Sequence, residues 1–91
     1  MDSEFDAEKD VANRGKHGVS LDFGERVFDD PEVLIAPTIR EADEEDRYKA
    51  IGLIDGALWT AVNVYRGERV RFISVRRSNV GEQRAYHSDR G

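Results

Sequence analysis

The chain has 91 residues, a length that predicts one domain spanning residues 1–91. It has no cysteine, which excludes disulfides, thiolate metal sites and cysteine nucleophiles. No apolar run approaches the roughly 20 residues that cross a bilayer, and the acidic first ten residues lack the apolar stretch of a secretory signal. We therefore expect a cytoplasmic protein that makes no membrane contact.

Charge is divided unevenly along the chain. Residues 1–46 hold 15 acids and 5 bases, whereas residues 47–91 hold 4 acids and 9 bases, eight of them arginine. Arginine suits bidentate phosphate contacts, so the second half is a candidate surface for a nucleic acid. A solvated arginine-rich surface is the alternative interpretation.

The N-terminal part predicts two helices. The first is capped by Asp6 or Ser3, runs to His17 and ends at Gly18, a residue that readily adopts the left-handed conformation. The second begins after Ser20 and runs through Phe28, before the helix-breaking segment 29–31.

The remainder predicts four strands and a last helix. The strands are 33–36, 47–54, 58–65 and 69–75, with hairpin turns at 55–56 and near Gly67. If residues 67–68 form a two-residue turn, Arg66 pairs with Arg69, Val64 with Arg71, and Val62 with Ile73. Ser78 or Asn79 caps a helix over 80–87, and the acid run 41–46 is predicted to be a mobile loop. The order indicates an α+β fold with a four-stranded, mostly antiparallel sheet.

Cofactor signals are weak throughout. The two histidines stand 70 positions apart, which argues against zinc, and the acid run lacks the glycine and final glutamate of a calcium loop. No phosphate-binding glycine pattern follows a strand. We expect neither a metal nor another cofactor, and His87 is interpreted as a bystander near the C-terminus.

Five segments in a fixed order resemble one protein family. They are KHGV (16–19), VFDDP (27–31), DRYKAIGL (46–53), RVRFISVRRS (69–78) and EQRAY (82–86), with Asp6, Lys9 and Asn13 at helical spacing upstream. Together they are similar to the BrnT toxins over about residues 5–87.

The resemblance implies a RelE-like fold and a metal-independent endoribonuclease that arrests translation. It also implies a cognate BrnA-like ribbon-helix-helix antitoxin, through which alone the pair contacts operator DNA. A heterotetramer of two toxins on an antitoxin dimer is the assembly implied. The expected reaction is attack by the RNA 2′-hydroxyl, giving a 2′,3′-cyclic phosphate. We further expect an acidic or extended antitoxin segment to cover the arginines.

Arg76, Arg77 and Arg47 are the leading candidates for catalysis. If the ends of their strands meet, three guanidinium groups would clamp the scissile phosphate. Exposed arginines that pair with the acidic loop are the alternative. Asp46, directly before Arg47, is a candidate base, an orienting partner of Arg47, or a solvated loop residue.

Other residues are candidates for proton transfer or RNA contact. His17 has an ordinary pKa of about 6.5, which suits either proton role, and Lys16 could reach a phosphate. Both residues could instead serve only to stabilise the helix end. Arg71, Tyr86 and Lys9 are candidate RNA contacts, although Tyr86 could equally anchor the last helix. Trp59 and Phe72 are interpreted as core.

Two departures from the family pattern favour an alternative function. Asp46 stands where a glutamate is expected, and the segment 76–78 reads Arg-Arg-Ser instead of Arg-Lys-Ala. A weakly active or inactive antitoxin-binding module that acts as a transcriptional corepressor is therefore the second hypothesis. A generic small α+β interaction domain is the third.

Overall fold

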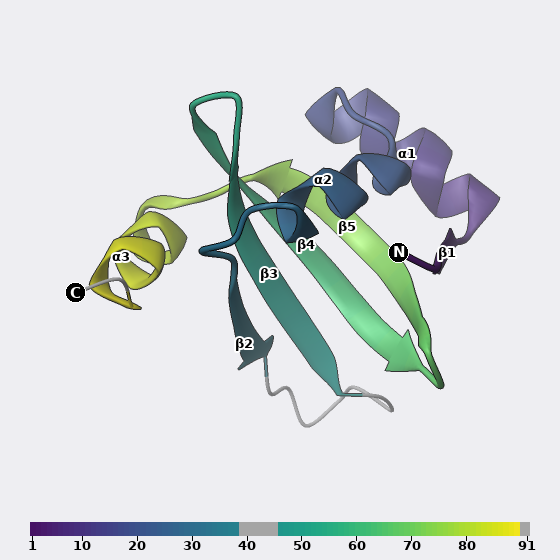
Figure 1. Ribbon diagram of the computed structural model, residues 1–91. Coiled ribbons are helices and arrows are strands. Elements are labelled where there is room, and N and C mark those ends of the chain that lie inside the picture. Colours follow the sequence, from purple (N-terminus) through teal and green to yellow (C-terminus); the bar gives the residue numbers. More distant parts are fainter. Residues whose placement is uncertain (39–45, 90–91) are drawn as a thin grey trace.

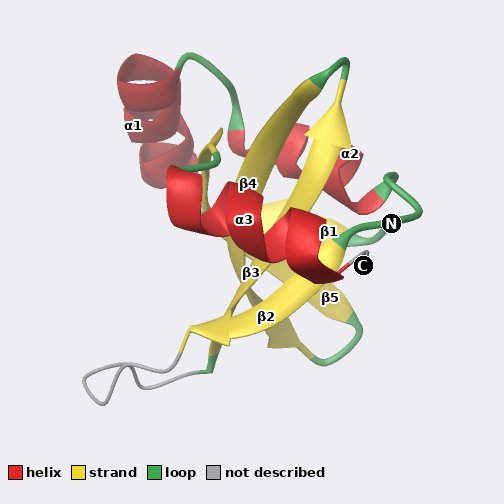
Figure 2. Cartoon of the chain, turned by 90° about the vertical axis from the view of Figure 1, so that its left-hand side faces the viewer, coloured by secondary structure: helices red, strands yellow, loops and turns green. Residues whose placement is uncertain are grey.

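The computed structural model describes residues 1–38 and 46–89, and shows one sheet with helices on both faces (Figure 1). The elements are β1 (Ser3–Phe5), α1 (Ala7–His17), the 3-10 turn η1 (Leu21–Phe23), α2 (Gly24–Phe28), β2 (Leu34–Thr38), β3 (Arg47–Ile54), β4 (Ala57–Arg66), β5 (Arg69–Arg77) and α3 (Val80–Asp89). The strand order is β1-β5-β4-β3-β2. Helices α1 and α2 cover one face, here called the α1 face, and α3 crosses the other, here called the α3 face (Figures 1 and 2).

The α+β class is confirmed, but the sheet differs from the prediction in its number of strands. β2 to β5 form the predicted antiparallel meander, whereas β1 adds a fifth strand parallel to β5. β1 has only three residues and pairs with a strand about 67 positions away, Ser3 with Val70. The expectation of four strands is therefore wrong, and no local pattern in the sequence reveals the pairing of β1 with β5.

α1 is fixed to the sheet by polar side chains. The Asp6 carboxylate caps it by accepting from the backbone amides of Glu8 and Lys9, which lowers the Asp6 pKa. Asn13 is buried; its amide donates to the Val75 carbonyl at 2.9 Å, and its oxygen accepts from the Val75 amide at 3.0 Å. Gly18 ends the helix at φ 78°, as the sequence predicts.

The second helix is shorter than predicted. It divides into η1 and α2, and the Ser20 side chain bonds to the Asp22 carboxylate without capping the backbone. α2 packs very closely, because a Cβ at Gly24 would lie 2.7 Å from the Phe72 ring. Glycine at this position therefore lets the Phe72 ring lie directly against the α2 backbone.

A β-bulge interrupts the β4–β5 ladder. Gly67, at φ 63°, makes the turn, and the predicted pairs Arg66–Arg69 and Val64–Arg71 are confirmed. The register shifts between Val62 and Asn63, so Val62 pairs with Ser74 and the predicted Val62–Ile73 pair is wrong. An extra residue in one strand reverses the alternation of side chains beyond it.

The larger core lies on the α1 face and includes Phe72, as predicted, whereas Trp59 is only partly buried and packs against this core. The smaller core, on the α3 face, joins Ile51, Leu58 and Tyr86. α3 begins at a capping box, in which the Glu82 amide donates to the Asn79 side chain and the Asn79 amide donates to the Glu82 carboxylate.

The expectations of an acidic loop and of no membrane-spanning segment can be compared only with the described residues. The predicted acidic loop lies outside them except for Asp46, which is exposed immediately before β3. No helix in the described part of the chain is long and apolar enough to cross a membrane.

Candidate functional site

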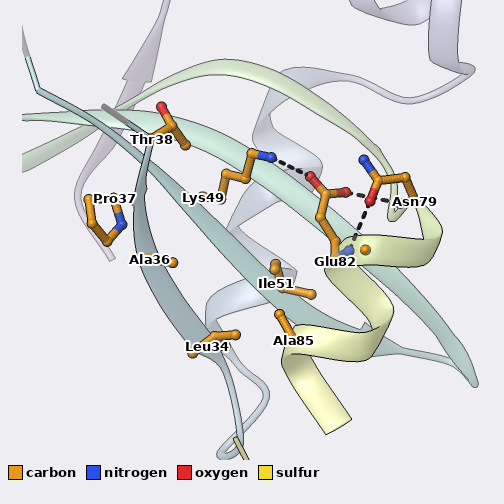
Figure 3. A pocket seen from close by; sticks show the side chains of 10 residues that line it. Leu34, Ala36, Pro37, Thr38, Lys49, Ile51, Asn79, Glu82 and Ala85 are labelled. Atoms are coloured by element: carbon orange, nitrogen blue, oxygen red, sulfur yellow. Dashed lines mark hydrogen bonds and ion pairs between the residues drawn. The ribbon is translucent and has the colours of Figure 1, made fainter. Parts of the chain in front are cut away.

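A buried carboxylate on α3 organises a polar cluster against the sheet. Glu82 is 5% exposed, and Arg76 donates to both of its oxygens, at 2.7 and 2.8 Å. The Lys49 ammonium lies 2.9 Å from the same carboxylate, and the Thr60 hydroxyl donates to it at 3.0 Å. Figure 3 shows Lys49 and Asn79 around Glu82. We call Arg76, Lys49, Thr60 and Glu82 the Glu82 cluster.

Glu82 is ionised at neutral pH. Burial raises the pKa of Glu82, but hydrogen bonds from Arg76, Lys49, the Asn79 amide and Thr60 outweigh it and hold the pKa well below its ordinary range. The same contact raises the pKa of Arg76. One anion and two cations leave a net positive charge, with the cationic side chains about a quarter and a third exposed.

Strand register explains why these side chains meet. Thr60 on β4 pairs with Arg76 on β5 on one side and with Ile51 on β3 on the other. Lys49 stands two residues before Ile51 and so projects from the same face of β3. Three neighbouring strands thus place the Lys49 ammonium, the Thr60 hydroxyl and the Arg76 guanidinium beneath the first turn of α3.

Two more arginines lie on this face, towards the opposite end of the sheet. Arg47 alternates with Lys49 on β3, and Arg71 pairs with Val64 on β4. Because of the bulge, Arg71 shares a face with Arg76, while Phe72 and Val75 both enter the α1-face core. Arg71 is ion-paired with Glu4 at 3.4 Å. We call Arg47, Lys49, Arg71 and Arg76 the cation face.

A groove of about 340 Å³ opens beside the Glu82 cluster, between β2, β3 and α3. Its walls are mainly aliphatic, from Leu34, Ala36, Ile51 and Ala85, and Lys49 reaches it from β3 (Figure 3). The groove and the cation face therefore share Lys49.

The predicted clamp of Arg76, Arg77 and Arg47 does not assemble. Adjacent residues of a strand point to opposite faces, and Arg77 lies over the Trp59 ring at 5.5 Å while Arg76 reaches Glu82. β3 and β5 run in the same direction, so Arg47 at the start of β3 is far from the end of β5. The prediction that these three arginines converge is therefore wrong.

The predicted helper residues lie on α1, across the sheet from the cation face (Figure 1). Lys9 and Lys16 are exposed, and His17 is half-buried in the last position of the helix. The Asn13–Val75 contact places the last turns of α1 beside the end of β5 on the α1 face. The structure therefore does not bring His17 or Lys16 to Arg76.

Tyr86 takes the second of its two predicted roles. It is 1% exposed, and its hydroxyl donates to the Asp30 carboxylate at 2.6 Å, so it anchors α3 to the loop after α2. A ring so buried cannot stack on a nucleobase without moving α3. His87 is exposed beside the Tyr86 ring.

Sequence reasoning missed Lys49, Thr60 and Glu82 as site residues. Glu82 was detectable as the third residue after the Asn79 cap, and Lys49 as the neighbour of Arg47 on one strand face. Their convergence depends on the pairing of β3, β4 and β5 and on the position of α3, which no short motif contains.

A comparison with protein-family models finds one match over residues 5–82, to the ribonuclease toxin BrnT of type II toxin–antitoxin systems. The chain belongs to the BrnT family. The match covers all of the cation face and ends at Glu82. No curated protein matches the chain. Membership makes this a ribonuclease-toxin domain of a system that includes an antitoxin, and confirms the resemblance drawn from the motifs.

Proposed function

We propose that the chain is a metal-independent endoribonuclease that cleaves RNA on the cation face, with Arg76 and Lys49 holding the scissile phosphate. The observation that carries this proposal is the convergence of both side chains on Glu82. The carboxylate holds the two cations in place while part of each remains accessible. Preorganised cations of this kind stabilise the charge that develops on a phosphorane.

The chemistry needs only groups that RNA and the protein possess. The 2′-oxygen attacks phosphorus, its proton passes to a base, the bond to the 5′-oxygen breaks, and that oxygen receives a proton. The products are a 2′,3′-cyclic phosphate and a 5′-hydroxyl. Arg76 and Lys49 stabilise the phosphorane, and Arg47 and Arg71 bind neighbouring phosphates.

The general base and the general acid need not be the residues that hold the phosphate. Glu82 is ionised and already accepts hydrogen bonds from every other member of its cluster. It therefore positions Arg76 and does not act as a general acid or base. Asp46 stays a candidate base from the sequence, although it would have to reach the phosphate from the start of β3, away from Arg76 at the end of β5. His17 and Lys16 would have to act from the other side of the sheet, which makes them weaker candidates than the sequence suggested.

A reaction in EDTA tests this proposal. Purified chain, free of antitoxin, is incubated with a structured RNA, and the fragment ends are identified by mass spectrometry. We expect cleavage that leaves 2′,3′-cyclic phosphates and that Lys49→Gln and Arg76→Gln reduce about 100-fold. Arg26→Gln, which removes an exposed cation on α2, is the matched control. RNA left intact by the unmutated chain would overturn the proposal.

A second candidate is a toxin-like corepressor with little activity. Arg77 is engaged with Trp59, Asp46 replaces the glutamate expected in the family, and Arg76 already donates to both oxygens of Glu82. In this case the chain would strengthen operator binding by a ribbon-helix-helix antitoxin, as part of a heterotetramer, without arresting translation. Tight antitoxin binding together with no RNA cleavage at any tested concentration would favour this candidate.

A further inference from the structure

The groove between β2 and α3 exists because small residues face one another across it. α3 places Gly81 and Ala85 on this side, and β2 places Ala36 there. The buried residues of α3 are Glu82 and Tyr86, which hold the helix to the sheet and to the Asp30 loop. The helix is thereby fixed while the space over β2 is left empty (Figure 3).

The chemistry of this groove favours a peptide over a nucleobase. Its aliphatic walls come from Leu34, Ala36, Ile51 and Ala85, and Thr38, Lys49, Asn79 and Glu82 add polar groups at its margin. Proteins hold single-stranded bases largely by aromatic stacking, and none of the residues that line the described groove is aromatic. Aliphatic side chains of a partner would bury their surface here.

β2 offers backbone groups next to the same groove. It is the last strand of the sheet, so one of its edges pairs with no described strand. An extended segment added to such an edge donates and accepts backbone hydrogen bonds and places alternate side chains on each face of the sheet. Pro37 lacks an amide, so it cannot donate a backbone hydrogen bond to an added segment.

The positive charge beside the groove indicates that its occupant carries an acidic residue. Lys49 is a third exposed at the groove, and Arg47 precedes it on the same face of β3. A carboxylate beside Lys49 would lie next to the Glu82 cluster and across the path of an RNA phosphate. Occupying this groove would therefore also obstruct the cation face.

We propose that the groove between β2 and α3 is the docking site of the antitoxin, which lays an extended segment along β2 with aliphatic side chains in the groove and an acidic residue on Lys49. This inference rests on the chain being the toxin of an antitoxin-controlled pair, and not on its cleaving RNA. The segment's inhibitory effect rests on the proposed phosphate site, which the segment would cover.

The test fills the groove at an exposed position of α3. Ala85→Trp places a large ring in the groove, and His87→Trp places the same ring at an exposed position on the opposite side of α3. The cognate antitoxin is titrated against each purified toxin variant by isothermal calorimetry, and thermal melting verifies that both variants fold. We expect Ala85→Trp to raise the Kd at least 10-fold and His87→Trp to change it less than 2-fold.

The outcomes separate the groove from the ribonuclease proposal. Equal Kd values for the two variants overturn the docking site, whether or not the toxin cleaves RNA. If Ala85→Trp leaves the antitoxin Kd unchanged but weakens binding of a 2′-O-methyl RNA oligonucleotide, the groove belongs to RNA and the proposal is wrong. Should Ala85→Trp fail to fold, Ala85→Met repeats the test, with His87→Met as its control.

Discussion

Arg71 and Arg76 point to the same face of β5 although they are five positions apart, an odd spacing. In a regular strand they would lie on opposite faces. The bulge opposite Val62 and Asn63 inserts one extra residue, Ile73, between the two pairing registers. The cation face therefore depends on one irregularity in the sheet, which also lets Phe72 and Val75 enter the same core.

Arg71 should contribute to RNA affinity without being required for the chemical step. Arg71→Gln is expected to weaken binding of a 2′-O-methyl RNA several-fold, and to reduce the slope of log affinity against log salt by about 0.7 for single-stranded RNA. Fluorescence anisotropy at several salt concentrations measures both. Arg26→Gln is the control, and an unchanged slope for Arg71→Gln would remove Arg71 from the interface.

Glu82 should stabilise the fold in a pH-dependent manner. Its pKa in the folded protein is lowered from 4.5, so its contribution is fully present above that value and is lost as pH falls through the folded pKa. Glu82→Gln should cost about 2 kcal/mol at pH 7, because Arg76 and Lys49 lose a buried partner. The difference from wild type should narrow progressively below pH 5.

Urea unfolding at pH 7 and at several acidic values measures this difference. Glu8→Gln, on the exposed side of α1, serves as the control and should track the wild type. A Glu82→Gln difference that stays constant with pH would show that packing, and not the ionised carboxylate, is what the substitution removes.

Tyr86 should matter for stability and not for RNA contact. Tyr86→Phe removes the hydrogen bond to Asp30 and should cost about 1 kcal/mol, whereas Tyr86→Ala leaves a cavity and should cost about 3–5 kcal/mol. Chemical denaturation measures both losses. A Tyr86→Phe protein of unchanged stability that has lost RNA binding would instead support the RNA contact that the sequence also suggested.

Asn13 should be among the most sensitive positions of α1. Its buried amide bridges the Val19 carbonyl to both backbone groups of Val75, so Asn13→Ala leaves those groups unpaired. We expect a loss of about 2–3 kcal/mol in the free energy of unfolding. Val11→Ala, at a 71% exposed position of the same helix, should change it by less than about 0.5 kcal/mol. Equal effects would contradict the role given to Asn13.

The sequence predicted those parts of the fold that depend on local signals. Asp6 and Gly18 bound α1, Asn79 caps α3, and the two hairpins follow their turn residues. β1 escaped prediction because its partner lies at the other end of the chain. The bulge escaped because Ile73 fits a regular alternation equally well.

The site was harder to predict than the fold. Arg76 was identified from its residue type, but its neighbour Arg77 was grouped with it because adjacency along the chain conceals opposite directions in a strand. Glu82 and Lys49 come from other elements, so only the tertiary pairing brings them to Arg76.

The adjacent pair Arg76 and Arg77 provides the most direct test of the cation face. RNA cleavage rates in EDTA are measured for Arg76→Gln and Arg77→Gln, with thermal melting to verify folding. If phosphate is held on the α3 face, Arg76→Gln should lower the rate about 100-fold and Arg77→Gln by no more than about 3-fold. An Arg77→Gln loss as large as that of Arg76→Gln, or no loss in either variant, would contradict the account.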